Sequence, residues 1–394
     1  MKRICIVVPP NLPMPPVKGG AIETLMQYIA EMNENEGKFD ITFISLWNCE
    51  AERLSSQYKN STYIYYHWKR IDNIKWFIFR VIRKITKINV DFLEPYEYFV
   101  TKYVLKNSFD IFINESADFN AFKKISLKMG RENCYAHLHS EFPSNKIIDN
   151  TFGKIITVSD YIKKQWMKTS LLKDEDIVVL KNCADTSRFS VELSNKDKIL
   201  LRTRLNLDEE DFVVYFCGRI VPQKGILELI NAIISIKDER VKLLIIGSPN
   251  FGNQGKKTEY LKNVEEKVEK HSSRIIFTGY IDNSELYKYY SISNCVVVPS
   301  TYEDPAPLVP IESLAAGKAL IVTNTGGAPE YVADNSGIIV KKEENLEKQL
   351  QDSILKVKNN NVLRNSLEDA AKNRAKLFTK EKYYSDFCNI IYRK

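Results

Sequence analysis

Short apolar runs alternate with longer helical patterns from one end of the chain to the other. The runs are rich in valine and isoleucine, and the segments between them carry apolar residues at the three-to-four spacing of an amphipathic helix. This alternation predicts βα units built on parallel sheets. The first set of predicted strands comprises Ile4–Val8, Ile41–Ser45, Ile111–Asn114, Cys134–His139, Ile155–Val158 and Ile177–Leu180.

The pattern restarts after a polar stretch near residues 186–200, and this restart predicts a second sheet. We therefore expect an α/β protein of two doubly wound, Rossmann-like domains that face each other across a cleft. The predicted domains are 1–190 and 191–370, followed by a helical, aromatic segment 371–394 that either closes the second domain or packs back on the first. The second set of predicted strands comprises Phe212–Cys217, Val241–Ile246, Arg274–Thr278, Cys295–Pro299, Ala319–Thr323 and Gly337–Val340.

The composition is that of a folded globular protein. Of the 394 residues, 44% are hydrophobic and 27% are charged. No apolar stretch approaches the roughly eighteen residues needed to cross a bilayer. The seven cysteines are scattered and form no C-x-x-C pair, which argues against disulfides or a zinc knuckle and favours a reducing compartment. The net charge of +7 is modest for this length and does not indicate nucleic acid. We expect a cytoplasmic protein.

Glycine-rich and basic loops follow two of the predicted strands, where parallel sheets bind their ligands. Gly19 and Gly20 stand between the first strand and a helical pattern. They form either a plain flexible turn or a place where backbone N–H groups approach an anion. Arg219 and Lys224 follow the strand that ends at Cys217. A planar guanidinium and a compact ammonium at a strand exit favour a diphosphate over the alternative of a solvated basic loop.

An acidic segment, Glu303–Glu312, leads into a short predicted helix. A proline in the first turn and a glycine after the end place Glu312 early on this helix and Asp304 in the loop before it. Carboxylates there can accept paired hydrogen bonds from vicinal sugar hydroxyls, and the helix start offers free N–H groups at Leu308 and Val309. For a single glutamate in a first turn, the alternative is compensation of the helix dipole.

This segment resembles the E-x7-E motif of retaining glycosyltransferases of family 4, which have the GT-B fold. The resemblance covers nearly the whole chain, and the motif departs from the family at its first position. The family's glutamate is here Asp304, one carbon shorter, with Glu303 beside it. The other segments that agree, in order, are Gly19–Gly20, Asn182–Asp185, Gly218–Gly225, Phe277–Tyr280 and Gly326–Glu330.

The resemblance implies transfer of a hexose-type sugar from a nucleotide-sugar, with UDP as the expected nucleotide, to a glycan or lipid-linked acceptor. The pathway it implies is the synthesis of cell-surface polysaccharide, such as capsule, or of glycoconjugates, with no metal and no other cofactor. Arg219 and Lys224 would hold the donor diphosphate and Glu312 the ribose, in a site completed when the domains close. The residues implied to bind the donor are Gly19, Gly20, Arg219, Lys224, Leu308, Val309 and Glu312. The residues implied to act in catalysis are Asp304, Glu303 and His139.

Two of the four histidines, His137 and His139, end a predicted strand. Strand residues two apart point to one face, so the two rings should lie together. They are either an ordinary polar strand end or part of a metal site, for which the sequence shows no third ligand at a suitable spacing. By resemblance, His139 would face the reacting sugar.

Residues 69–87 carry seven cations against one acid, Asp72. At helical spacing the isoleucines and valines share one face, and most of the cations lie on the other with Trp76 and Phe77. Such a helix either packs on the first domain with a solvated basic back or lies on an anionic membrane surface. The second alternative predicts a peripheral protein at the inner face of the plasma membrane, where a lipid-linked acceptor would lie. No nucleic-acid-binding module accompanies the stretch, so we expect no nucleic-acid partner.

Two rival functions are compatible with the same fold. A nucleotide-sugar epimerase would turn over the donor without an acceptor. A non-catalytic subunit that binds sugar nucleotides is favoured by the departure at Asp304 and opposed by Arg219, Lys224 and Glu312.

Overall fold

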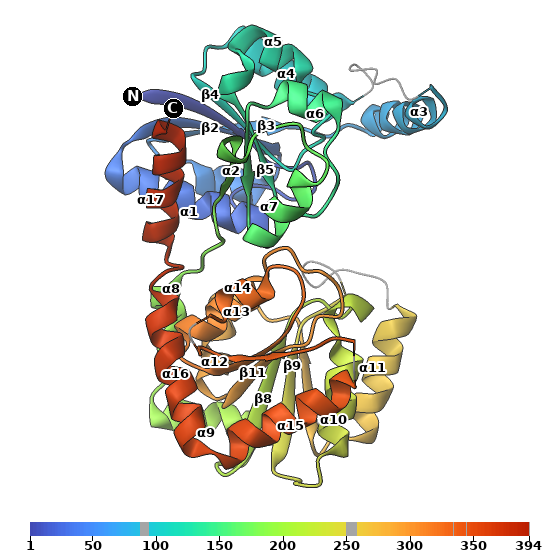
Figure 1. The fold of residues 1–394 in the computed structure, drawn as a ribbon, viewed down its shortest axis with the longest axis vertical. Coiled ribbons are helices and arrows are strands. Elements are labelled where there is room, and N and C mark those ends of the chain that lie inside the picture. The colour runs from blue at the N-terminus through green and yellow to red at the C-terminus, as the bar shows by residue number, and fades with distance from the viewer. Residues whose placement is uncertain (87–93, 250–257, 334, 344, 394) are drawn as a thin grey trace. The chain divides into compact units, whose positions relative to one another are not determined.

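The chain forms two compact units, each with its own parallel sheet (Figure 1). Unit 1 contains Met1–Lys181 and Tyr383–Lys394, and unit 2 contains Asn182–Lys382. The polar stretch 186–200 lies inside unit 2 and carries helix α8 and the first part of α9. The computed structural model describes residues 1–86, 94–249, 258–333, 335–343 and 345–393.

Unit 1 is built on a seven-stranded parallel sheet with the order β3-β2-β1-β4-β5-β6-β7. Its central strand β1 is buried from Ile4 onward, as expected for a sheet that helices cover on both faces. The sequence pattern does not predict β3, an edge strand whose tyrosines are only half-buried and which has no run of aliphatic residues. The strands are β1 (Lys2–Val7), β2 (Phe39–Leu46), β3 (Ser61–Tyr66), β4 (Ile111–Glu115), β5 (Cys134–Leu138), β6 (Lys154–Thr157) and β7 (Ile177–Val179).

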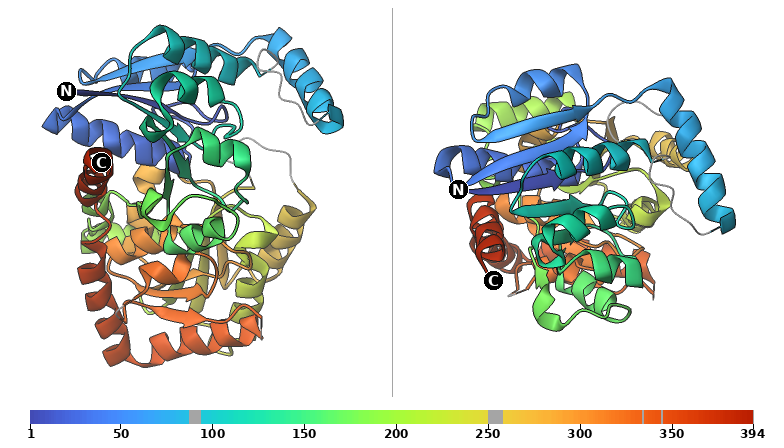
Figure 2. Two further views of the ribbon diagram at one scale, coloured as in Figure 1. Left: turned by 45° about the horizontal axis from the view of Figure 1, so that its top comes forward. Right: turned by 90° about the horizontal axis from the view of Figure 1, so that it is seen from above.

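The C-terminal helix α17 belongs largely to unit 1, although it follows unit 2 in the sequence (Figure 2). The Tyr384 hydroxyl donates a hydrogen bond to Asn33 Oδ1 of α1 at 2.8 Å, and Phe387 packs edge-on against Phe39 of β2. The helices that contribute to unit 1 are α1 (Ala21–Glu36), α2 (Cys49–Ser55), α3 (Arg70–Thr86), α4 (Pro95–Lys106), α5 (Lys123–Met129), α6 (Lys146–Thr151), α7 (Asp160–Met167) and α17 (Lys380–Tyr392).

Unit 2 has a six-stranded parallel sheet with the order β10-β9-β8-β11-β12-β13. The strands are β8 (Phe212–Cys217), β9 (Val241–Ile246), β10 (Ile275–Gly279), β11 (Cys295–Val298), β12 (Ala319–Thr323) and β13 (Ile338–Val340). The helices are α8 (Thr186–Phe189), α9 (Asn195–Arg204), α10 (Ile226–Ser235), α11 (Glu259–Lys270), α12 (Leu286–Ser291), α13 (Leu308–Ala315), α14 (Ala328–Tyr331), α15 (Leu346–Asn359) and α16 (Asn361–Ala375).

Both faces of the unit 2 sheet are buried under helices. Val214 and Phe216 point into one hydrophobic cluster with residues of α10 and α15, whereas Val213 and Tyr215 point into a second cluster with residues of α13 and α16. Alternate strand residues therefore fill two separate layers, which is why these strands read as continuous apolar runs. The prediction of two doubly wound, Rossmann-like domains is confirmed.

None of the described helices combines the length and the hydrophobicity that a bilayer-crossing segment needs. All seven cysteines are free thiols, and five of them are buried. Burial in the strand cores raises the pKa of thiols such as Cys5 and Cys295 far above the ordinary range, so these cysteines act as small apolar residues.

Candidate functional site

The predicted donor-binding residues of unit 2 follow the two strands at which the strand order reverses. β8 and β11 are neighbours, and the sheet continues from β8 to β9 and β10 on one side and from β11 to β12 and β13 on the other. Doubly wound sheets bind ligands at this point, outside the carboxyl ends of the strands. Lys224 ends the loop after β8, and Asp304 lies in the loop after β11.

Close backbone contacts hold these two loops together. Gly225 has φ +67°, and a Cβ at this position would lie 1.9 Å from the carbonyl oxygen of Pro299, so only glycine fits. Thr301 donates its backbone N–H to the carbonyl of Gln223 at 3.0 Å. Lys224, between these two contacts, is therefore fixed beside the loop after β11.

Lys224 and Asp304 form an ion pair at the carboxyl end of the sheet. The distance from Lys224 Nζ to Asp304 Oδ2 is 2.5 Å, and the two side chains are only 19% and 8% exposed. The ammonium also lies over the ring of Tyr302, 5.3 Å from its centroid. The pair offers a fixed cation that suits a phosphate and a fixed carboxylate that suits sugar hydroxyls.

Glu303 has different partners from its neighbour Asp304. One of its carboxylate oxygens pairs with Lys342, and the other accepts the Gly326 N–H at 2.6 Å. Partial burial alone would raise the pKa of Glu303, but the contacts with Lys342 and Gly326 outweigh it and hold the pKa below its ordinary value. Asp304, and not Glu303, is thus the acid that contacts Lys224.

Helix α13 begins at Leu308, as the sequence predicts, and no side chain caps its N-terminus. Leu308 and Val309 form its first turn, where N–H groups lack helical partners and the helix dipole favours an anion. The loop before it is anchored by Asn182, whose side-chain amide donates to the carbonyl of Ala306 at 2.9 Å. The predicted phosphate-binding amides therefore lie on a fixed helix end.

Glu312 lies further along α13 and is 5% exposed. The hydroxyl of Tyr290, itself fully buried, donates to Glu312 Oε2 at 3.0 Å. Burial raises the pKa of Glu312, and the hydrogen bond from Tyr290 and the nearby Arg188 partly offset this effect. The arrangement fits a carboxyl held in place by the protein. Arg219, in contrast, lies on the β8 loop with its side chain exposed.

In unit 1, the Gly19–Gly20 loop leads into helix α1, whose N-cap is Gly20 with φ +109°. A Cβ on Gly20 would lie 2.1 Å from Glu23 Oε2, so the carboxyl of Glu23 fills the space beside this glycine. Glu23 is 3% exposed, and burial raises its pKa to about 7. Gly19 has φ +74° and open space around it. The loop therefore carries a buried carboxyl that the sequence pattern does not reveal.

The two histidines of unit 1 share one carboxylate. Glu115 Oε2 lies 2.8 Å from His137 Nδ1 and 2.7 Å from His139 Nε2. Burial alone would raise the pKa of Glu115, but the two imidazoles outweigh it and lower the pKa to about 2. Burial, with His137 beside it, lowers the pKa of His139 to about 4, so this ring is neutral at pH 7. With its Nε2–H donated to Glu115, His139 presents Nδ1 as an acceptor.

Glu115 supplies the third metal-ligand side chain that the sequence spacing does not show. The ligand atoms of Glu115, His137 and His139 all lie within 4.8 Å of one another, and this is the group of three that emerges from the described residues. Glu115 Oε1 and His137 Nε2 are buried without a hydrogen-bond partner. The trio could therefore hold a divalent ion such as zinc, and the prediction of no metal stays a prediction.

Residues 197–374 match a family model described as glycosyl transferases group 1. A lipopolysaccharide 1,2-N-acetylglucosaminetransferase of Salmonella typhimurium is 26% identical over 349 residues, which cover 85% of this chain and 83% of that protein. A capsular polysaccharide biosynthesis glycosyltransferase, CapM of Staphylococcus aureus, is 32% identical over 218 residues, which cover 51% and 53% of the two chains.

Solved structures with the same architecture cover almost the entire chain. The HepE protein of Anabaena, solved in complex with UDP-glucose, superposes with a TM-score of 0.76 at 17% identity and covers 99% of both chains. A glycosyltransferase of Rickettsia africae gives a TM-score of 0.73 at 17% identity and covers 100% of both chains. The two Rossmann-like units therefore have the GT-B fold. Residues 197–374 are thus similar to glycosyl transferases group 1, and the whole chain shares the fold of the solved glycosyltransferase structures.

Proposed function

We propose that the chain transfers a hexose-type sugar from a nucleotide-sugar, with retention of anomeric configuration and without a metal ion. The observation that carries the proposal is the largely buried Lys224–Asp304 pair at the strand-order reversal of unit 2. UDP is the proposed nucleotide, and the complex of the similar HepE structure with UDP-glucose supports it. The proposed acceptor is a glycan or lipid-linked glycan in cell-surface polysaccharide synthesis, in line with the lipopolysaccharide and capsule relatives.

The fixed charges of unit 2 suit this chemistry. Transfer develops negative charge on the leaving diphosphate, which the Lys224 ammonium and the uncapped start of α13 stabilise without reorganising. Arg219 supplies a second cation from the same loop. Asp304 accepts hydrogen bonds from hydroxyls of the transferred sugar, and Glu312 accepts them from the ribose.

Nucleotide binding tests the proposal first. We expect UDP at 100 times its dissociation constant to stabilise the protein by about 2.7 kcal/mol in a thermal-shift panel that also contains GDP and ADP. Lys224→Ala should abolish this stabilisation. The matched control is Lys237→Ala. Lys237 is exposed and lies just before β9, at the amino ends of the strands and away from the predicted site. If no nucleotide stabilises the wild-type protein, the donor site is not competent and the proposal is refuted.

Asp304 separates sugar recognition from nucleotide binding. Asp304→Asn keeps the size of the side chain and removes the charge that pairs with Lys224. We expect UDP to bind this variant at least as tightly as the wild type, because the lysine is released, whereas sugar transfer falls at least about tenfold. Equal losses of UDP affinity and transfer would assign Asp304 to holding the loop instead.

Three readouts on the same reaction distinguish the rivals. Conversion of the sugar nucleotide without an acceptor would identify an epimerase. Transfer that survives EDTA supports the metal-independent proposal, and loss that zinc restores would assign metal chemistry to the Glu115, His137 and His139 trio. The anomeric coupling constant of the first-formed product, measured by NMR, tests retention directly.

A further inference from the structure

Helix α3 of unit 1 presents an apolar face that the described residues of the unit leave exposed. The side chains along this face, separated by three or four residues, are between 41% and 75% exposed. They are Ile71, Ile74, Phe77, Ile78, Val81 and Ile85. Phe77 therefore lies at the edge of the apolar face, and its predicted place among the cations is wrong. In Figures 1 and 2, α3 extends away from the sheet of unit 1.

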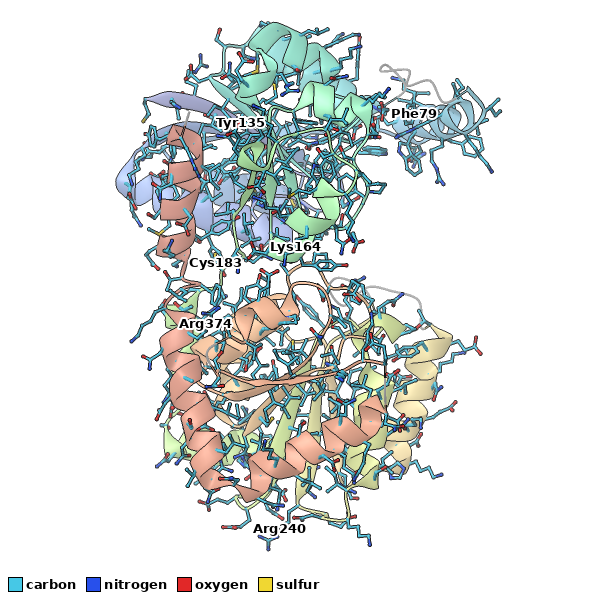
Figure 3. The ribbon with its side chains drawn as sticks, viewed as in Figure 1. Phe79, Tyr135, Lys164, Cys183, Arg240 and Arg374 are labelled. Carbon is cyan, nitrogen blue, oxygen red and sulfur yellow. The ribbon has the colours of Figure 1, made fainter. Side chains whose placement is uncertain are left out.

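The opposite side of α3 is the side that anchors it. Phe79 is 3% exposed, and the carboxylate of Asp72 accepts hydrogen bonds from the Tyr66 hydroxyl and the Lys69 N–H, both at 2.8 Å (Figure 3, where Phe79 is labelled). Arg83 pairs with Asp118 at 2.5 Å. The alternative in which the isoleucines pack on unit 1 and the cations face water is therefore wrong for the described helix. Lys87, which also belongs to the basic stretch, lies outside the described residues.

Cations flank the apolar face, whereas Trp76, four residues after Asp72 and three before Phe79, lies on the anchoring side of the helix. Arg80 and Lys84 are exposed beside Phe77 and Val81, and Lys75 lies on the other edge. The Arg80 guanidinium lies over the ring of Trp76, 4.8 Å from its centroid, and this tryptophan is 45% exposed. An amphipathic helix with an exposed apolar face and flanking cations matches a bilayer surface, with apolar side chains among the acyl chains and cations at anionic headgroups.

We propose that α3 docks unit 1 on an anionic lipid bilayer, lying in the interface with Phe77 and its apolar neighbours inserted. The charge of the helix selects this occupant, because its exposed cations complement anionic headgroups, whereas a second copy of the same helix would bring these cations against each other. The proposal concerns α3 alone and does not depend on the transferase activity.

Vesicle sedimentation of the full chain tests the proposal. We expect binding to vesicles of phosphatidylcholine with 30% phosphatidylglycerol, in about 150 mM salt, and little binding to phosphatidylcholine alone. Each cation near the surface strengthens partitioning by about fivefold, so Arg80→Glu with Lys84→Glu should weaken binding by about 25-fold or more. Phe77→Ser should weaken binding without changing the net charge. Circular dichroism and thermal melting confirm that each variant is folded.

The matched control is Lys262→Glu with Lys270→Glu on α11 of unit 2, which changes the net charge equally at two exposed lysines. Equal weakening by the control and the α3 variant would overturn the proposal, because it would show attraction by net charge alone. Wild-type protein that ignores anionic vesicles would also overturn it. So would a dimer in lipid-free solution that Phe77→Ser dissociates, since the face would then join two copies.

Depth of insertion gives an independent readout. Brominated acyl chains should quench the tryptophan emission of the bound Phe77→Trp variant more strongly than that of the bound wild-type protein. Quenching that Phe77→Trp does not increase would place another part of unit 1 on the membrane and contradict the docking by α3.

Discussion

Replacing Glu23 by glutamine tests the electrostatics of the Gly19–Gly20 loop. The carboxyl of Glu23 fills the space beside Gly20 and is 3% exposed. Burial raises its pKa from 4.5 to about 7, and a hydrogen bond from its own backbone N–H offsets part of this effect. Glutamine has the same shape and stays neutral at every pH, so the substitution removes the titration and keeps the packing.

The sign and size of the effect follow from linkage. A carboxyl whose pKa is higher in the folded state binds its proton more tightly there, so its contribution is fully present below pH 4.5 and declines as the pH rises to about 7. This loss amounts to about 3 kcal/mol at pH 8 and about 1 kcal/mol at pH 5. The advantage of Glu23→Gln over wild type should therefore grow by about 2 kcal/mol between these two pH values.

Urea unfolding followed by tryptophan fluorescence measures this difference. All four tryptophans, Trp47, Trp68, Trp76 and Trp166, lie in unit 1, so the signal reports on that unit. Glu50→Gln, an exposed carboxyl on α2, is the control and should show no such growth with pH. An advantage of Glu23→Gln that is the same at pH 5 and pH 8 would refute the buried, proton-binding carboxyl.

Two further substitutions test fixed elements of the units. Gly225→Ala should destabilise unit 2 by about 2 kcal/mol or more, because the new Cβ would lie 1.9 Å from the carbonyl oxygen of Pro299. Gly279 has a similar φ of +74° but open space around it, so Gly279→Ala should destabilise the unit by only about 1 kcal/mol. Similar melting temperatures for the two variants would contradict this. Glu115→Gln should destabilise unit 1 by about 1–3 kcal/mol, because a neutral amide oxygen accepts hydrogen bonds from the two imidazoles more weakly than the carboxylate oxygen does. Unchanged urea unfolding would show that the charge of Glu115 does not matter for these contacts.

The sequence predicts most of the fold because parallel sheets covered on both faces leave a strong local signal. Strands such as β9 and β12 are continuous apolar runs, and all six strands of unit 2 fall on the predicted segments. The sequence does not predict β3, because an edge strand with half-buried tyrosines shows only a weak alternation of apolar and polar residues. The sequence leaves open whether the last helix packs on the first or the second domain, because the answer depends on contacts between residues more than three hundred positions apart, such as Tyr384 of α17 and Asn33 of α1.

The sequence likewise predicts those residues of the candidate site that depend on local turns and does not predict those that depend on strand pairing. Loop positions such as Lys224 follow from turn chemistry and from the rule that ligands bind at strand ends, both of which are local in sequence. The role of Glu115 is not local, because it lies beside His137 only through the parallel register of β4 and β5, where the two residues are direct partners. Because strand register is set by tertiary pairing, no spacing in the sequence predicts the contact between Glu115 and His137.

Helix α3 shows most directly what the periodicity of apolar residues cannot predict. A three-to-four repeat of apolar residues establishes that a helix has an apolar face, but it does not say what that face contacts. The usual inference, that the apolar face packs on the protein, is wrong for α3, whose anchoring contacts come from Asp72, Phe79 and Arg83 instead. Asp72 accepts hydrogen bonds from Tyr66 and Lys69, and Arg83 pairs with Asp118, which leaves the remaining cations beside the exposed face. The distribution of charge, more than the hydrophobic pattern, therefore distinguishes a helix that docks on a membrane from one that packs in a core.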